Sequence, residues 1–257
     1  MALFYCAICG PGLVRAENQD NLYINGVYRG NISDNAVFRY EDVSVDGGLF
    51  AVADGMGGEK RGDLAALEAV RNMGDIDPAD GRRGMVRHID ECNAVICEHM
   101  KANGARIGST FVGLCIAGGR ADIVNVGDSR LYMFRGGELA QLSRDHTSVR
   151  QMLELGAITE EAARRHPDRH DLTQHLGIFP AEMVIEPHTA YAEVEAGDIF
   201  LLCSDGLTDM LEDACIKKLL ETDGSVCEKA EALYDIAIMN GGRDNITVLL
   251  VQADKGD

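Results

Sequence analysis

Three aspartates stand next to a glycine, or two residues from one, where strand-like segments begin or end. Asp54 follows the apolar run 49–53, Asp205 follows the run 201–204, and Asp244 precedes the last apolar run of the chain. Taken singly, an Asp-Gly pair is a common turn signal. Because Asp54 and Asp205 each follow a continuous apolar strand, we expect their carboxylates to emerge together at one edge of a buried sheet. Carboxylates so placed repel each other unless a proton or a cation neutralises them, and all-oxygen ligation suits Mg²⁺ or Mn²⁺.

The first of these aspartates opens a glycine-dense segment, 54–58, with the sequence DGMGG. So many glycines let backbone carbonyl groups approach a cation, or let a substrate come close to the main chain. A nucleotide-binding loop is the competing interpretation, but the segment lacks the Lys-Ser/Thr ending of such loops.

A guanidinium and a further carboxylate stand in the segment 15–20, RAENQD. The planar side chain of Arg15 is suited to bidentate recognition of phosphate, and Asp20 adds another acidic group. Taken alone, the same six residues could be an exposed loop with an internal ion pair.

The elements that must position these residues alternate between strand-like and helical patterns. The segments between 110 and 143 are expected to form a meander of antiparallel strands, and 26–48 is a polar insert. Strand runs interleaved with helix pairs predict antiparallel sheets packed against helices. Strands are predicted at 4–9, 22–24, 49–53, 110–116, 121–126, 131–135, 139–143, 183–191, 199–203 and 246–252, and helices at 63–73, 85–100, 150–155, 159–165, 213–221 and 226–239.

Composition favours one globular domain and excludes several classes of partner. The 257 residues carry 42 acidic and 24 basic side chains, so the net charge is −18. This charge opposes non-specific binding to the phosphate backbone of nucleic acid. No stretch approaches the roughly 18 apolar residues of a membrane span, and no basic leader precedes the first apolar run. We therefore expect a cytoplasmic protein.

The eight cysteines do not form a recognisable metal or disulfide framework. Only Cys6 and Cys9 have CxxC spacing, and no second pair follows at the spacing of a zinc finger. Residues three apart on a strand point to opposite faces, so this pair is predicted to chelate poorly. Reduced core thiols are the preferred interpretation.

Six segments, in this order and separation, resemble the metal-dependent serine/threonine protein phosphatases of the 2C class, particularly the compact bacterial type. The resemblance covers nearly the whole chain. The segments are RAENQD at 15–20, LFAVADGMGG at 49–58, GSTFVG at 108–113, NVGDSRLY at 125–132, LLCSDGLTDML at 201–211 and GGRDNITVLLV at 241–251.

The resemblance implies an α+β fold in which two packed, mainly antiparallel β-sheets are flanked by helices on both faces, an αββα sandwich. It also implies a small helical flap, a lobe beside the active site at about 146–177. The chain 1–257 would then be a single phosphatase domain.

A binuclear Mn²⁺ or Mg²⁺ centre at one end of the sandwich is also implied. Arg15 would bind the substrate phosphate and, with Asp54, act in catalysis. The implied ligands are Asp54, which bridges both ions, Asp205 and Asp244 for one ion, the backbone carbonyl of Gly55 for the other, and Asp20 through a water molecule.

One further metal assignment carries an open alternative. Asp128 matches the position that helps to bind a third, weaker metal together with Asp205, but a structural turn aspartate is the alternative. The flap histidines His166, His170 and His175 receive no catalytic role. Met56 stands where many eukaryotic relatives have a histidine proposed as general acid, so the leaving alkoxide must take its proton from metal-bound water or another group.

The implied activity is hydrolysis of phosphoserine and phosphothreonine in proteins by a metal-activated water molecule. Phosphorylated proteins are the expected partners, a serine/threonine kinase or its targets among them. The alternative is a catalytically silent module of the same fold that binds phosphoproteins. Retention of Asp54, Asp205 and Asp244 counts against it, because clustered carboxylates without metals destabilise the fold.

Overall fold

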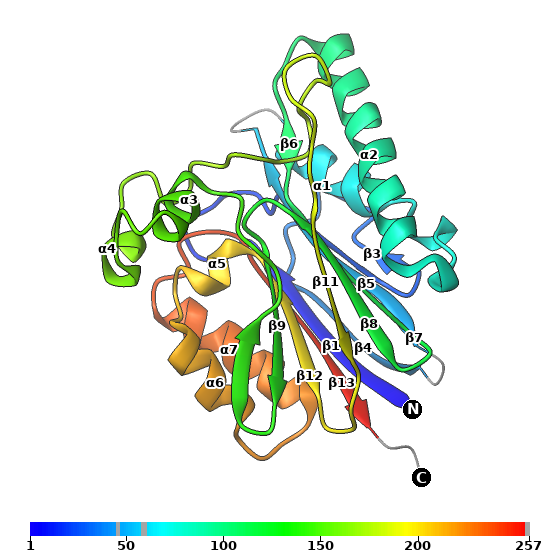
Figure 1. The fold of residues 1–257 in the computed structure, drawn as a ribbon, viewed down its shortest axis with the longest axis vertical. Coiled ribbons are helices and arrows are strands. Elements are labelled where there is room, and N and C mark those ends of the chain that lie inside the picture. Colours follow the sequence, from blue (N-terminus) through cyan, green and yellow to red (C-terminus); the bar gives the residue numbers. More distant parts are fainter. Residues whose placement is uncertain (45–46, 58–60, 255–257) are drawn as a thin grey trace.

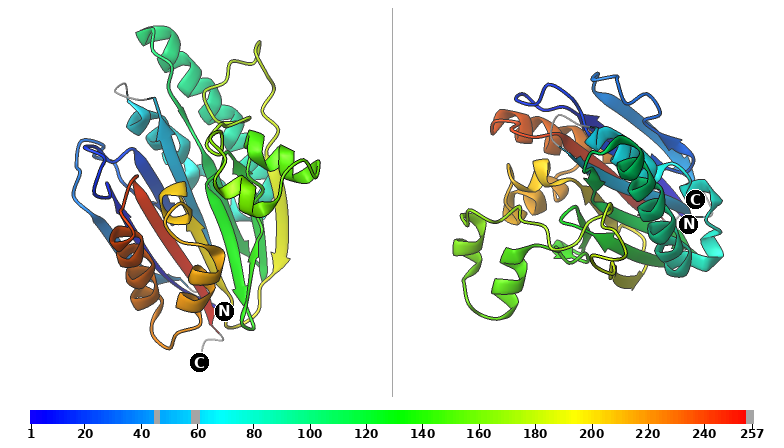
Figure 2. Two further views of the ribbon diagram at one scale, coloured as in Figure 1. Left: turned by 90° about the vertical axis from the view of Figure 1, so that its left-hand side faces the viewer. Right: turned by 90° about the horizontal axis from the view of Figure 1, so that it is seen from above.

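The computed structural model describes residues 1–44, 47–57 and 61–254. Over these residues the chain forms two antiparallel sheets stacked face to face, with helices on the outer faces (Figures 1 and 2). This confirms the predicted αββα sandwich. Gly58, the last residue of the glycine-dense segment, lies outside the described residues.

The first sheet joins the two ends of the chain. Its neighbouring strands β1 (Ala2–Gly10) and β13 (Ile246–Asp254) pair antiparallel over their whole length. Its order is β10 (Glu138–Gln141), β9 (Arg130–Arg135), β12 (Ile199–Cys203), β13, β1 and β4 (Phe38–Ser44).

The second sheet carries the strand that ends in the glycine-dense segment. That strand, β5 (Gly48–Met56), lies between β7 and β2, and β6 (Gly108–Ser109) pairs with its last residues. The order is β11 (His188–Glu193), β8 (Arg120–Val126), β7 (Phe111–Ala117), β5, β2 (Asp20–Ile24) and β3 (Val27–Tyr28).

The side chains of β1 show how the layers are made. Leu3, Tyr5, Ala7 and Cys9 belong to the core between the two sheets, whereas Cys6 faces the helices on the outer side. This is the period of two that a strand imposes. The prediction that Cys6 and Cys9 point to opposite faces is therefore confirmed.

Helix pairs cover the two outer faces (Figures 1 and 2). The N-terminus of α7 (Val226–Met239) is fixed by a capping box between Ser225 and Glu228. The second sheet is covered by α1 (Gly62–Val70) and α2 (Gly81–Asn103), with 3₁₀ turns η1 (Met73–Asp75) and η2 (Pro78–Asp80) between them, and the first sheet by α6 (Asp213–Leu220) and α7 (Val226–Met239).

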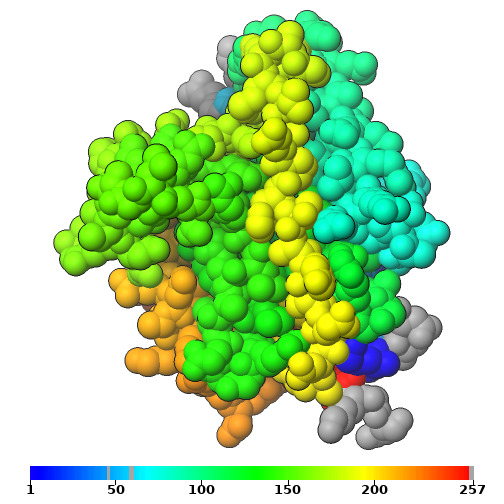
Figure 3. Space-filling model, viewed as in Figure 1, coloured from blue at the N-terminus to red at the C-terminus, as the bar shows by residue number. Residues whose placement is uncertain are grey.

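The segment 146–177, predicted to be the flap, stands beside the sandwich and contains α3 (Ser148–Glu154) and α4 (Glu160–Arg164) (Figure 2). Both helices begin at a threonine, Thr147 or Thr159, whose hydroxyl accepts a backbone N–H. The segment that leads from the flap into β11 then runs along one face of the molecule (Figure 3). None of the helices in the described part is long and apolar enough to cross a membrane.

The predicted meander of four strands is wrong. The hairpin β7–β8 lies in the second sheet and the hairpin β9–β10 in the first. Each hairpin turns locally at a Gly-Gly pair, but the link 127–129 carries the chain from one sheet to the other, where β8 pairs with β11 and β9 with β12. A local turn pattern cannot say which sheet the next hairpin joins.

Some element boundaries also differ from prediction. The strand expected at 183–191 begins only at His188, and the polar insert 26–48 contains β3 and the edge strand β4. One face of β4 is solvent-exposed, which explains its polar composition. The strand β5 does not end at Asp54 but continues to Met56.

Candidate metal centre

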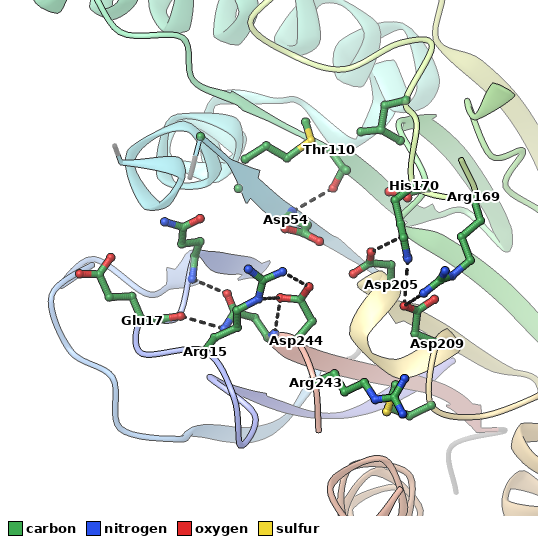
Figure 4. A pocket seen from close by; sticks show the side chains of 18 of the residues that line it. Arg15, Glu17, Asp54, Thr110, Arg169, His170, Asp205, Asp209, Arg243 and Asp244 are labelled. Atoms are coloured by element: carbon green, nitrogen blue, oxygen red, sulfur yellow. Dashed lines mark hydrogen bonds and ion pairs between the residues drawn. The ribbon is translucent and has the colours of Figure 1, made fainter. Parts of the chain in front are cut away.

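The predicted acidic residues converge on one cavity of about 750 Å³ at one end of the sandwich (Figure 4). We call it the carboxylate cavity. Its lining comes from the end of β5, the loop before β2, the flap, the short helix α5 (Asp205–Thr208) and the segment before β13. The acidic side chains that line it include Asp54, Asp128, Asp205, Asp209 and Asp244.

Asp54 is held by backbone hydrogen bonds in the second sheet. Its N–H donates to the Thr110 hydroxyl at 2.9 Å, and its carbonyl accepts from the Thr110 N–H at 2.9 Å. Burial, together with the charges of Asp20 and Asp205, raises the pKa of Asp54 well above its usual range. The carboxylate is thus fixed in a place where its negative charge is unfavourable without a compensating cation.

Asp20 lies beneath the cavity, opposite Asp54 in the register of β2 and β5. Its side chain is buried, and the hydroxyls of Ser204 and Thr247 each donate to Oδ2 at 2.7 Å. The other oxygen, Oδ1, is buried and has no hydrogen-bond partner. Burial raises the pKa of Asp20 to about 7, although the two hydroxyls act in the opposite direction.

Asp205 is the first residue of α5, and only Ser204 separates it from the end of β12. Its Oδ1 is also buried without a partner, and its Oδ2 lies 3.3 Å from Nδ1 of His170. Ligand atoms of Asp128, His170 and Asp205 lie within 4.8 Å of one another. Burial and the charge of Asp205 raise the pKa of Asp128. The structure thus brings together the two residues that the resemblance pairs at a third metal site.

Arg15 and Asp244 meet at the mouth of the cavity. Nε and a terminal nitrogen of Arg15 donate to the two carboxylate oxygens of Asp244 at 2.9 and 2.7 Å. The next residue, Asn245, accepts from the Gln19 N–H and donates to the Glu17 carbonyl, both at 2.8 Å. Asn245 therefore holds the segment that carries Arg15 against the start of β13, a role that the sequence analysis did not assign.

Gly55 lines the cavity at a point where two backbones pass close by. A Cβ at this position would lie 2.1 Å from the carbonyl oxygen of Gly62 and 2.7 Å from that of Gln19. Glycine is needed here so that α1 and the loop before β2 can pack against β5. Whether its carbonyl binds a cation stays a prediction.

The flap reaches the cavity through two residues that the sequence analysis left without a role. His170 contacts Asp205 and, through Nε2, Asp209 at 3.2 Å, and Arg169 lies 3.7 Å from the same carboxylate (Figure 4). Asp209 stands four residues after Asp205, a helical spacing that could have identified it. No local signal points to His170, because the flap is brought to the cavity only by the tertiary fold.

The donor set fits hard divalent cations. Among the residues that the structure describes, Oδ1 of Asp20 and Oδ1 of Asp205 are the only buried side-chain nitrogen or oxygen atoms without a hydrogen-bond partner. Buried polar atoms normally have a hydrogen-bond partner. Two buried carboxylate oxygens without one, close to other carboxylates, are therefore suited to bind a cation. Oxygen ligands of this kind suit Mg²⁺ or Mn²⁺ rather than zinc.

The family profile described as Protein phosphatase 2C matches residues 29–232. The chain belongs to the protein phosphatase 2C family. This confirms the family that the six sequence segments predicted, and the match includes strands of both sheets and most of the helices.

Relatives in the protein phosphatase 2C family are similar over most of this chain. The serine/threonine phosphatase stp of Listeria monocytogenes is 34% identical and covers 95% of this chain and 93% of its own length. PstP of Mycobacterium tuberculosis is 32% identical over 97% of this chain, which spans only 45% of that relative's length. The solved catalytic domain of PstP in complex with two manganese ions has a TM-score of 0.80 and 31% identity, covering 99% of this chain and all of that chain.

His146, at the start of the flap, should make stability depend on pH. It is buried, its Nδ1 accepts the Gly127 N–H at 3.1 Å, and burial lowers its pKa to about 4, aided by the charges of Arg144 and His188. Its stabilising contribution is complete above the unfolded pKa of about 6.5 and is lost as pH falls to about 4. The loss should be on the order of 3 kcal/mol.

Urea unfolding of metal-free protein at pH 7 and at pH 4.5 measures this effect. In His146→Asn the amide oxygen can still accept the Gly127 N–H but does not titrate, so its stability should fall less over the same range. An identical pH dependence in both proteins would exclude His146 as the source.

Proposed function

We propose that this chain hydrolyses phosphoserine and phosphothreonine in proteins, using two Mn²⁺ or Mg²⁺ ions in the carboxylate cavity. The observation that carries the proposal is the pair of buried carboxylate oxygens without partners, one on Asp205, which lines the cavity, and one on Asp20, which pairs with the lining residue Asp54. The relatives named as serine/threonine phosphatases support the reaction, and the two manganese ions of PstP support the cofactor.

The proposed ligands follow the positions that converge in the cavity. When bound, the cations lower the pKa of a water molecule and neutralise negative charge on the phosphoryl group. Asp54 would bridge the two ions, Asp205 and Asp244 would bind one and the Gly55 carbonyl the other, Asp20 would act through water, and Asp128 would bind a third ion with Asp205.

The chain's own residues would place the phosphate and shape the cavity. Arg15 stands at the mouth with 58% of its side chain exposed, so it can exchange its contact with Asp244 for a substrate phosphate. Met56 lines the cavity and cannot donate a proton, so the leaving alkoxide must be protonated by another group. The flap residues Arg169 and His170 close one side.

Metal removal is the direct test of this proposal. Turnover of phosphoserine and phosphothreonine peptides and of p-nitrophenyl phosphate should require Mn²⁺ or Mg²⁺, fall to background with a chelator, and return when Mn²⁺ is restored. Phosphotyrosine peptides serve as the comparison for residue preference. A folded protein that binds phosphopeptides but shows no metal-dependent rate would be the silent binding module instead.

Arg15→Ala should raise KM for phosphopeptides by about 10-fold or more, because a charge-assisted hydrogen bond contributes about 1.5–3 kcal/mol. Saturating Mn²⁺ keeps metal loading constant, since the substitution also leaves Asp244 without its arginine partner. Arg243→Ala is the matched control, because Arg243 lines the same cavity. An equal rise in KM for both variants would mean that positive charge in general, and not Arg15, attracts the phosphate.

The wider assignments rest on this activity. We propose that residues 1–257 act as one phosphatase domain with the flap at 146–177, and that phosphorylated proteins, such as a serine/threonine kinase or its targets, are the substrates. The acidic lining of the cavity supports substrate binding through metal ions. A cytoplasmic location stays a prediction from the sequence.

A further inference from the structure

A second cluster of metal-binding side chains lies on the outer face of the first sheet. One ligand atom each of Cys6, Glu41 and Cys227 lies within 4.8 Å of the others. The register of β1 and β4 places Cys6 opposite Glu41, and Cys227 is the second residue of α7, which packs on β1. None of the three is among the residues that line the carboxylate cavity.

The three side chains already lie close together. The Cys227 thiol donates to Oε2 of Glu41 at 2.9 Å, and the sulfur atoms of Cys6 and Cys227 lie within 4.8 Å of each other. Cys6 is buried, Cys227 is half-buried and Glu41 is exposed. The cluster therefore has a closed inner end and an open outer end through which an ion can enter.

Glu231 is a candidate for a fourth metal ligand. Glu231 stands four residues after Cys227 on α7, so both side chains lie on the same face of the helix. Its charge acts on the Cys6 thiol. Glu231 or a water molecule could therefore complete a four-coordinate site.

We propose that Cys6, Cys227 and Glu41 bind a borderline-soft divalent cation of the zinc class. Two thiolates and one or two carboxylates are ligands that such an ion accepts in tetrahedral geometry. With metal–sulfur bonds of about 2.3 Å, tetrahedral sulfur ligands lie roughly 3.8 Å apart. The ligand atoms now lie between 2.9 Å, for Cys227 and Glu41, and at most 4.8 Å apart, so the site needs only small adjustments. The carboxylate cavity offers hard oxygen ligands, so the two sites select different metals.

Binding at this site would tie together three elements that are distant in sequence. The ion displaces the protons of both thiols and joins β1 to β4 and to the N-terminus of α7. Because the unfolded chain cannot present these ligands together, the bound ion stabilises the native fold. This role is separate from phosphatase activity, and its test does not depend on turnover.

Titration of the metal-free, reduced chain with Co²⁺ tests the site. A sulfur-to-cobalt charge-transfer absorption should appear, which the oxygen ligands of the carboxylate cavity cannot produce, and Zn²⁺ should abolish it. Cys227→Ser should lose this band, and Glu41→Gln should bind Co²⁺ at least about tenfold more weakly. Cys215→Ser, which alters another half-buried thiol on α6, is the matched control and should keep the band.

Three results would overturn the assignment. They are a folded wild-type protein without the band, a band that survives in Cys227→Ser, or unchanged Co²⁺ affinity in Glu41→Gln. The last variant changes an exposed side chain, so it keeps the test decisive if Cys227→Ser does not fold. Loss of two titratable thiols on exposure to peroxide, with no band in the reduced protein, would identify a disulfide pair instead.

Discussion

Asp54→Asn should lower kcat for phosphopeptides by about 1,000-fold or more, with the unfolding temperature unchanged or raised. Loss of the proposed bridging ligand removes several kcal/mol of charge stabilisation from the transition state, and each 1.36 kcal/mol is a factor of ten in rate. The fold should tolerate the change, because asparagine has nearly the same shape and the backbone contacts of Asp54 with Thr110 remain.

The effect on stability has the opposite sign to that on catalysis. Burial and neighbouring carboxylates raise the pKa of Asp54, so its charge is unfavourable in the metal-free protein. Removing that charge relieves repulsion. Steady-state kinetics at saturating Mn²⁺ and thermal unfolding in chelator together measure the two effects.

Asp198→Asn is the matched control. Asp198 is also buried, but it precedes β12 in the first sheet, at the end of that strand away from the cavity. There Arg135 donates to both of its carboxylate oxygens at 2.7 Å. Its substitution should destabilise the fold by about 1–3 kcal/mol and leave kcat unchanged. A normal kcat in Asp54→Asn, or a loss of kcat in both variants, would refute the bridging role of Asp54.

Gly206→Ala should destabilise the protein by about 3 kcal/mol or more and remove most of its activity. Gly206 is the second residue of α5, where a Cβ would lie only 1.9 Å from the carbonyl oxygen of Asn245. The overlap is with backbone, so no side-chain rotation can relieve it. The helix that carries Asp205 must therefore move away from the segment that carries Asp244 and Asn245.

Urea unfolding and phosphopeptide kinetics of Gly206→Ala are best compared with those of Gly30→Ala. Gly30 is exposed, and its Cβ would meet nothing closer than Cε2 of Tyr28 at 3.8 Å. That control should stay within about 0.5 kcal/mol of wild type, with unchanged turnover. If Gly206→Ala were equally harmless, the close approach of α5 to Asn245 would not be what positions Asp205.

Several features were predictable because they depend on residues close together in the sequence. The apolar run before Asp54 predicted a buried strand, and the spacing of Val226 to Met239 predicted α7 with its actual boundaries. The opposite orientation of Cys6 and Cys9 follows from the period of a strand alone. The six segments, in their order, were enough to identify the family.

Other features were decided only by tertiary structure. The turn patterns predicted one meander of four strands between 110 and 143, but the division of these strands between two sheets depends on strands β11 and β12 much later in the chain. The hydroxyls of Ser204 and Thr247 on Asp20, and the flap contact of His170 with Asp205, join residues that no local pattern relates.

The two proposed metal sites differ in the same way: one was predictable from the sequence and the other was not. The residues of the carboxylate cavity stand in recognisable segments, so the sequence alone indicated a site for a hard cation. Cys6 and Cys227 meet only because β1 and α7 pack together, and no spacing pattern in the sequence relates them. Backbone periodicity sets which way a side chain points within its own element, but the packing of distant elements sets which side chains it meets.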